Sequence, residues 1–110
     1  METVEKYRAH VQKLIEKYGY FSSNDDLETQ IITDEKHDHY QLVHVGWHNN
    51  RRTYGCVLHI DIKNDKIWIQ HDGTEIGMAN EFVALGVPKE DIVLAFHAPY
   101  KRQYTGFAMG

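Results

Sequence analysis

Apolar residues recur at three- and four-residue intervals along the first part of the chain, from about Glu2 to Tyr18. This spacing puts them on one side of a helix and predicts that this side packs against the rest of the protein. Gly19 follows directly and is predicted to end the helix. The stretch SSNDD, residues 22–26, has the composition of a loop. The inward positions are Val4, Tyr7, Val11, Leu14, Ile15 and Tyr18.

Between residues 27 and 70 the pattern changes to an alternation of apolar and polar residues, which predicts four β-strands. The first strand is expected to span Leu27 to Asp34 and to pair with the second across residues 35–38. Asn64 and Asp65 are predicted to form a two-residue turn between the third and fourth strands, because both tolerate left-handed backbone angles. This turn pairs Ile62 with Ile67 and Ile60 with Ile69.

The stretch HNNRRTYG, residues 48–55, is predicted to hold the turn between the second and third strands, with Asn50 and Arg51 at its tip. The two turns then agree on which side of the sheet is apolar, and a slip of one residue would destroy that agreement. The predicted apolar side consists of Val43, Val45, Trp47, Tyr54, Cys56, Leu58, Ile60, Ile62, Ile67 and Ile69. The opposite side consists of His44, His48, His59, Asp61, Trp68 and Gln70.

The last third of the chain predicts a second helix and a short final segment. Asp72 and Glu75 resemble a capping box, so a helix is expected from about residue 74 to 85, ending at Gly86. Pro88 is expected to begin a short helical turn over residues 88–91. Residues 92–96 are apolar, but too few for the pattern to separate helix from strand. The inward residues of the second helix are predicted to be Ile76, Ala79, Phe82 and Val83.

Together these elements predict an α+β fold in a single domain, residues 1–110, which is an ordinary length for one core. Its parts are an N-terminal helix, a four-stranded antiparallel meander sheet, a C-terminal helix and a short helical or extended segment. The sequence has no apolar run near the roughly 20 residues that a membrane span needs. It shows no signal peptide, and we expect a cytoplasmic protein.

Charge and cysteine content limit the classes of function that the chain can have. The formal net charge of −4 argues against a protein that is basic over its whole surface, although a local basic patch remains open. Cys56 is the single cysteine, which excludes an internal disulfide. Since alternation puts Cys56 on the apolar side, we expect a small buried side chain and not a nucleophile.

Eight histidines in 110 residues raise the question of metal binding. His44, His59 and Asp61 share the predicted polar side, and imidazole with carboxylate suits zinc or iron. Ordinary polar residues on the wet side of a half-buried sheet explain the same pattern, and no tight metal-binding spacing supports a site. We therefore predict no catalytic residue, metal or cofactor, and keep a small metal-dependent enzyme of the nuclease type as an alternative.

Two groups of residues are candidates for contact with a protein partner or with DNA. Arg51 and Arg52 lie near the predicted hairpin tip, and guanidinium groups match phosphates and carboxylates. The C-terminal tail combines basic residues with aromatic residues. This composition is typical of interface cores and of surfaces that stack on nucleic acid bases. The candidates in the tail are Tyr100, Lys101, Arg102, Tyr104 and Phe107.

Three long motifs, RRTYGCVLHIDIK, KIWIQHDGTEIG and GVPKEDIVLAFH, lie within residues 46–108. With EKYR near the N-terminus and the start of the second strand at Asp38-His39-Tyr40, they make the chain resemble the XisI family. These are the fdxN-element excision controlling factor proteins of cyanobacteria. The resemblance implies a small α+β protein without a recognised catalytic site, and it supplies no functional residues.

The resemblance also implies a role. The founding member is an accessory factor for excision of a DNA element, beside a separate recombinase and a second factor, XisH. We therefore expect a non-enzymatic accessory protein that acts through a XisH-like partner. Direct binding to DNA, assembly into a homo-oligomer, and a different role for this copy of the family remain open alternatives.

Overall fold

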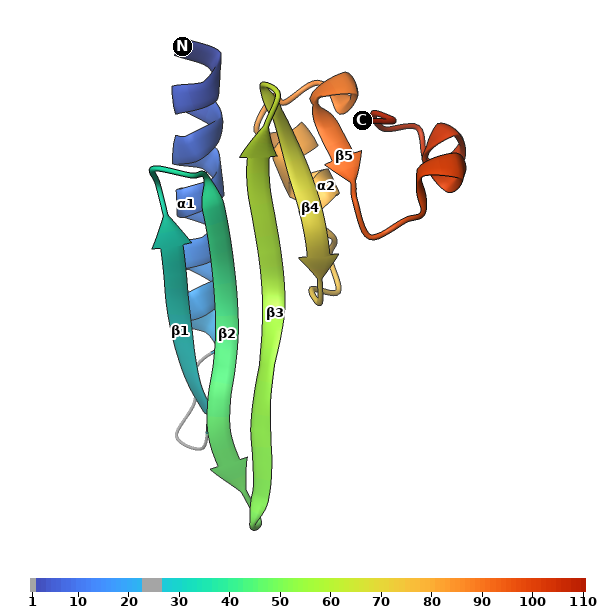
Figure 1. Ribbon diagram of the computed structural model, residues 1–110. Coiled ribbons are helices and arrows are strands. Elements are labelled where there is room, and N and C mark those ends of the chain that lie inside the picture. The colour runs from blue at the N-terminus through green and yellow to red at the C-terminus, as the bar shows by residue number, and fades with distance from the viewer. Residues whose placement is uncertain (1, 23–26) are drawn as a thin grey trace.

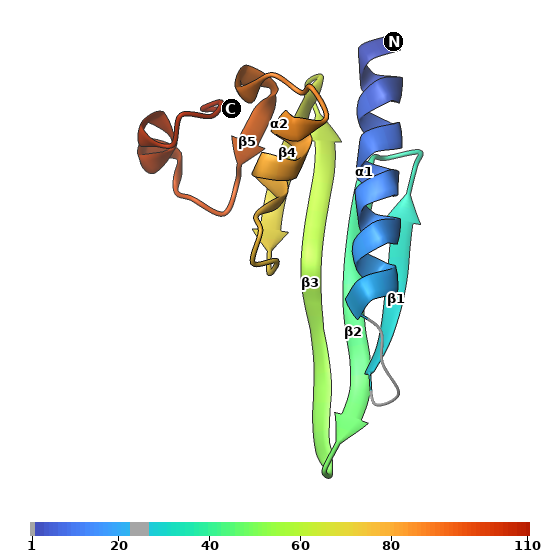
Figure 2. The same cartoon turned by 180° about the vertical axis from the view of Figure 1, so that it is seen from behind.

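Two helices cover one face of a five-stranded sheet in the computed structural model, which describes residues 2–22 and 27–110 (Figures 1 and 2). The sheet order is β1-β2-β3-β4-β5; the first four strands run antiparallel, and β5 runs parallel to β4. The elements are α1 (Glu2–Ser22), β1 (Leu27–Asp34), β2 (His39–His48), β3 (Arg51–Lys63), β4 (Lys66–Asp72), α2 (Met78–Ala84), η1 (Lys89–Asp91), β5 (Ile92–Leu94) and η2 (Pro99–Tyr104), the last being, like η1, a short 3-10 helix.

The core forms between the helices and the sheet, on the face that the periodicity predicts. The inward side of α1 is confirmed, since Tyr7, Val11, Leu14 and Ile15 are buried. Within the described residues, no helix is both long and apolar enough to cross a membrane. The remaining buried residues of the core cluster are Tyr40, Leu42, Leu58, Ile60, Ile62, Ile67, Ile69, Met78, Phe82, Val87 and Ile92.

The predicted end of α1 at Gly19 is wrong, because the helix continues to Ser22. A Cβ at Gly19 would lie only 3.3 Å from the Cδ1 atoms of Ile31 and Leu42. The absence of a side chain therefore serves close packing of α1 on the sheet and not a left-handed cap. The predicted loop at 22–26 begins with a helical residue, and residues 23–26 lie outside the described residues.

The turn between β3 and β4 forms as predicted. Asn64 and Asp65 have φ values of 54° and 62°, the left-handed angles that a tight two-residue hairpin needs. Ile62 pairs with Ile67, and Ile60 with Ile69. The pairing of β1 with β2 across residues 35–38 is also confirmed.

The turn between β2 and β3 is one residue earlier than predicted. Asn49 and Asn50 form the tip, with φ values of 50° and 65°, and His48 pairs with Arg51. Two adjacent asparagines tolerate these angles better than an Asn-Arg pair. Arg51 is therefore the first residue of β3 and not part of the turn.

A β-bulge in β3 then shifts the pairing of β2 and β3 by one residue, so that Leu58 lies opposite Leu42. Val43 pairs with Cys56 but Leu42 pairs with Leu58, so Val57 is the extra residue. A bulge of this kind shifts the alternation of side chains by one position. The prediction of one continuous apolar side is thus wrong for the outer part of the β2–β3 hairpin. It is confirmed for the inner part of β3 and for β4, where the buried residues are Leu58, Ile60, Ile62, Ile67 and Ile69.

The side chains beyond the bulge are therefore on the opposite side from the one predicted. Trp47 is 60% and Tyr54 72% exposed, although both were expected in the core. Cys56 is exposed and not buried. His44 lines a hollow beside Tyr18 of α1, on the helix-covered face, and not the open face where it was expected.

The second helix is shorter than the sequence predicts. The Asp72 carboxylate accepts hydrogen bonds from the backbone N–H groups of Thr74 at 2.9 Å and Met78 at 2.7 Å, so α2 begins only after this loop. Phe82 is buried and Ala79 packs against the core as predicted, whereas Ile76 and Val83 are exposed.

The end of the chain resolves the ambiguity over residues 92–96. Gly86, with φ of 94°, follows the end of α2, and the predicted turn after Pro88 is η1. Residues 92–94 form β5, a fifth strand beside β4. Parallel neighbours need a crossover connection, and α2 lies within that connection.

An ion pair fastens α1 to the turn between β1 and β2. Arg8 donates from Nε and Nη2 to the two carboxylate oxygens of Asp38, at 2.7 and 2.9 Å. The Tyr40 hydroxyl donates to the same carboxylate at 3.0 Å. These hydrogen bonds, with that from Arg8 dominant, lower the pKa of Asp38 below its ordinary value.

Candidate partner-binding surfaces

The outer hairpin comprises residues 43–56 of β2 and β3, and its end, from residue 47 onward, extends beyond α1 and beyond the pairing with β1 as a two-stranded projection (Figure 1). The Arg52 guanidinium carbon lies 5.4 Å from the ring centroid of Trp47 and 5.8 Å from that of Tyr54. A cation at this range is attracted to the ring faces. The two exposed rings and Arg52 thus form one ordered group beside the tip.

Such a group has the composition of an interface hot spot. Trp, Tyr and Arg dominate the residues whose truncation costs binding energy. Stacking of Arg52 on the rings reduces the side-chain freedom that binding would otherwise remove. Arg51, the first residue of β3, is also exposed, but strand alternation puts its side chain on the opposite face from Arg52. An apolar or acidic surface would complement this group in both shape and charge.

The sequence identified Arg51 and Arg52 but missed the two aromatic residues beside them. Trp47 and Tyr54 were assigned to the core because the alternation was carried through β3 without the bulge at Val57. The Asn49-Asn50 pair, which suits a turn with two left-handed residues, could have placed the turn correctly but gives no sign of the bulge. With the turn there, Val45 pairs with Tyr54 and Trp47 with Arg52.

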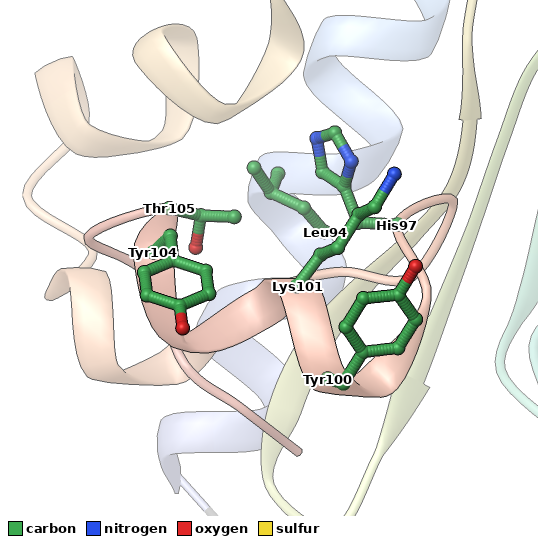
Figure 3. Close-up of a pocket in the computed structure, with 6 residues that line it drawn as sticks. All are labelled: Leu94, His97, Tyr100, Lys101, Tyr104 and Thr105. Carbon is green, nitrogen blue, oxygen red and sulfur yellow. The ribbon is translucent and has the colours of Figure 1, made fainter.

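The second candidate surface lies on η2. A pocket of about 630 Å³ is lined by Leu94, His97, Tyr100, Lys101, Tyr104 and Thr105 (Figure 3). Tyr100 is 68% and Tyr104 81% exposed. The Lys101 ammonium lies 5.8 Å from the ring centroid of Tyr100. This is an open, largely aromatic hollow with one cation at its edge.

Two further tail candidates have packing roles. Arg102 donates from Nε to the His97 carbonyl at 3.0 Å and from Nη2 to the Ala95 carbonyl at 3.3 Å. Its guanidinium also lies 5.6 Å from the ring centroid of Trp68 on β4. Phe107 packs against the core. Arg102 and Phe107 thus hold the tail on the sheet, and leave Tyr100, Lys101 and Tyr104 exposed.

The histidines considered for metal binding are rearranged by the same change of register. His59 and Asp61 lie together, but their neighbour is His39 of β2 and not His44. His39 Nδ1 lies 2.8 Å and His59 Nε2 3.0 Å from Oδ1 of Asp61. The hydrogen bond to Asp61 raises the pKa of His39 above its ordinary value, since it favours the protonated ring.

With the geometry described, comparison with known proteins identifies the family. A family model described as XisI protein matches residues 1–109. The chain belongs to the XisI family. The resemblance seen in the sequence motifs is therefore confirmed.

Two solved structures resemble this XisI chain over almost its full length. A XisI-like protein from Anabaena variabilis is 47% identical, with a TM-score of 0.90 over 96% of this chain and 97% of that one. The fdxN element excision controlling factor XisI from the same organism is 35% identical, with a TM-score of 0.87 over 98% and 99% of the two chains. The predicted α+β fold is thereby confirmed as the XisI fold. A comparison with curated proteins found no match.

In this XisI chain the two basic groups do not form one patch. Arg102 stacks on Trp68, whose partner on β3 is Asp61. Arg52 is nine residues from Asp61 along the same strand, a span of about 30 Å at the usual rise per residue. Arg51 and Arg52 therefore do not join Lys101 and Arg102 in a single basic patch. Figures 1 and 2 show the hairpin tip and η2 well apart.

Proposed function

We propose that this chain is a non-enzymatic accessory factor that controls excision of a DNA element of the fdxN type and acts through a XisH-like protein partner. The observation that carries the proposal is the 35% identity, over 98% of the chain, to a protein named fdxN element excision controlling factor XisI. The partner would bind the exposed aromatic and cationic group of the outer hairpin.

The chemistry of that surface supports binding over catalysis. Cys56 is its only thiol, and although this residue is exposed, partial desolvation of its sulfur raises the pKa of the thiol, while the S–H donates to the Leu58 carbonyl at 3.3 Å. A thiol with a raised pKa is mostly protonated near neutral pH and is a poor nucleophile. Trp47, Arg52 and Tyr54 contribute shape, apolar area and charge, which are the properties of a contact surface.

A protein partner also fits the charge distribution better than DNA does. The chain carries a formal net charge of −4, and its two basic groups are separated by most of the length of β3. Binding to DNA draws its affinity from several lysines and arginines that contact neighbouring phosphates. The arginine pair of the hairpin is too small a group for that, but sufficient to orient an acidic protein surface.

Co-expression with a XisH-like protein tests the proposal. Capture of one partner should recover the other, in the presence of nuclease, so that DNA cannot bridge them. The double variant Trp47→Ala/Tyr54→Ala should reduce recovery by about tenfold or more, as expected when a hot spot is truncated. Tyr20→Ala, which removes an exposed tyrosine of α1, is the matched control and should leave recovery unchanged.

The same variants locate the contact surface. If Tyr100→Ala/Tyr104→Ala abolishes recovery and the hairpin variant does not, the partner binds the tail and the assignment to the hairpin fails. If both wild-type proteins are soluble and neither recovers the other, the partner proposal itself fails. A reporter for excision that contains the recombinase should show element loss only when this chain and its partner are both supplied.

A further inference from the structure

Three metal-ligating side chains converge on the open face of the sheet, away from both helices. They are His39 from β2 with His59 and Asp61 from β3. Their ligand atoms all lie within 4.8 Å of one another. Asp61 is the least exposed of the three side chains and His39 the most. The proposed function uses none of them.

The spacing of these atoms is close to that of a zinc centre. A tetrahedral zinc ion at its usual bond lengths keeps neighbouring ligand atoms about 3.3 Å apart. Both histidine nitrogens are at 2.8 to 3.0 Å from the same oxygen of Asp61. An ion could therefore enter among the three groups if each nitrogen–oxygen separation widened by only a few tenths of an ångström.

The neighbouring glutamines orient two of the ligands. The side-chain nitrogen Nε2 of Gln41 lies 3.3 Å from Nδ1 of His59, and a flip of the amide exchanges this nitrogen with the carbonyl oxygen. With its carbonyl oxygen turned to that nitrogen, Gln41 would accept the Nδ1–H and leave the Nε2 lone pair free toward Asp61. The Gln70 amide donates to the other oxygen of Asp61 at 3.2 Å. Metal-ligating histidines and carboxylates are commonly held by hydrogen bonds of this kind.

We propose that His39 Nδ1, His59 Nε2 and the Asp61 carboxylate bind one divalent transition-metal ion of the zinc class. The fourth position faces solvent and takes a water molecule. Two imidazole nitrogens favour zinc, cobalt or nickel over magnesium and calcium, which prefer oxygen ligands. The site is carried on two adjacent paired strands, which keep the three groups together without the ion.

Titration with zinc chloride tests the site, using full-length protein freed of its affinity tag and of metal. Calorimetry should show one zinc ion per chain and no heat with magnesium chloride. His39→Gln, His59→Gln and Asp61→Asn should each weaken zinc binding by at least the roughly 10–100-fold typical of a lost outer-sphere partner. Gln70→Leu, which removes only an orienting bond, should weaken it by about tenfold.

A matched control separates this site from general binding by histidines. His48→Gln removes an exposed histidine from the hairpin tip and should leave zinc affinity unchanged. Cobalt chloride provides a second measurement, since tetrahedral cobalt absorbs strongly in the visible range, and the absorption should disappear in Asp61→Asn. The proposal is wrong if wild type takes up no zinc, or if His48→Gln weakens binding as much as the ligand variants. Neither outcome bears on capture of the XisH-like partner.

Discussion

Replacing Asp38 by asparagine tests how α1 is fastened to the sheet. The substitution keeps the shape of the side chain and tolerates the left-handed backbone at this position, where φ is 58°. It removes the charge and puts an amide donor opposite one of the two Arg8 donors. The lost interaction is therefore the paired, charge-assisted hydrogen bonding of Arg8 with Asp38.

The expected loss of unfolding free energy is about 1–2 kcal/mol. Hydrogen bonds to charged groups contribute about 1.5–3 kcal/mol. The lower part of this range applies because the Arg8 side chain is 36% exposed and solvent screens the pair. Urea denaturation at pH 7 would measure the difference between wild type and Asp38→Asn. Asp34→Asn, which removes a carboxylate that is more exposed than Asp38 and has a histidine neighbour, is the matched control and should cost less.

The pH dependence gives a sharper test. Because Arg8 lowers the pKa of Asp38 in the folded state, the ionised carboxylate stabilises the folded protein fully at any pH well above 3.8, which is the ordinary pKa of an aspartate. That stabilisation is lost as the pH falls through the lowered pKa of the folded state. The difference between wild type and Asp38→Asn should thus be constant from pH 5 to 8 and shrink below about pH 4. A difference that stayed the same down to pH 2 would refute the assignment to the charged pair.

Four further variants have expected outcomes in urea denaturation. Phe82→Ala should cost about 3–5 kcal/mol, because it opens a cavity where α2 packs on the sheet and the side chain is fully buried; a loss below 1 kcal/mol would contradict that packing. Gly73→Ala should cost about 1–3 kcal/mol, since the new Cβ would lie 2.9 Å from the Val57 carbonyl oxygen that accepts the Gly73 N–H. Gly86→Ala, at φ of 94°, should cost about 1 kcal/mol of unfolding free energy through backbone strain alone. The circular dichroism spectrum of the folded variant should match that of wild type, which would show that the fold itself is unchanged. Trp47→Ala/Tyr54→Ala should change stability little, because both rings are exposed; a large loss would mean that the outer hairpin is part of the core.

Local periodicity was sufficient for the elements that form the main core. The inward side of α1, the first strand and the turn at Asn64 and Asp65 are as predicted, because each depends on residues close together in the chain. The family was also recognisable from its motifs. The candidate contact residues in the tail were chosen by composition, which did not show that Arg102 binds backbone carbonyls.

The errors over which face each side chain of the β2–β3 hairpin occupies share one physical origin, which is the pairing of segments that are distant in sequence. Alternation within β3 is uninterrupted in the sequence, so it gives no sign that Val57 is an extra residue. The bulge satisfies two demands at once: the Asn49-Asn50 turn at one end and burial of Leu58 opposite Leu42 at the other. Only when β2 and β3 are paired do these demands conflict by one residue.

The sequence by itself therefore determined the fold class, the core strands and the covering helix, since these depend on short-range patterns of burial. It also determined the family, which its motifs identified. The tertiary structure alone decided that Trp47 and Tyr54 face solvent beside Arg52, and that His39, not His44, joins His59 and Asp61. It also decided that Gly19 lies inside a helix and that β5 completes the sheet. The physical reason is that a side chain's face on a strand changes with a single bulged residue, and whether a bulge forms depends on the partner strand.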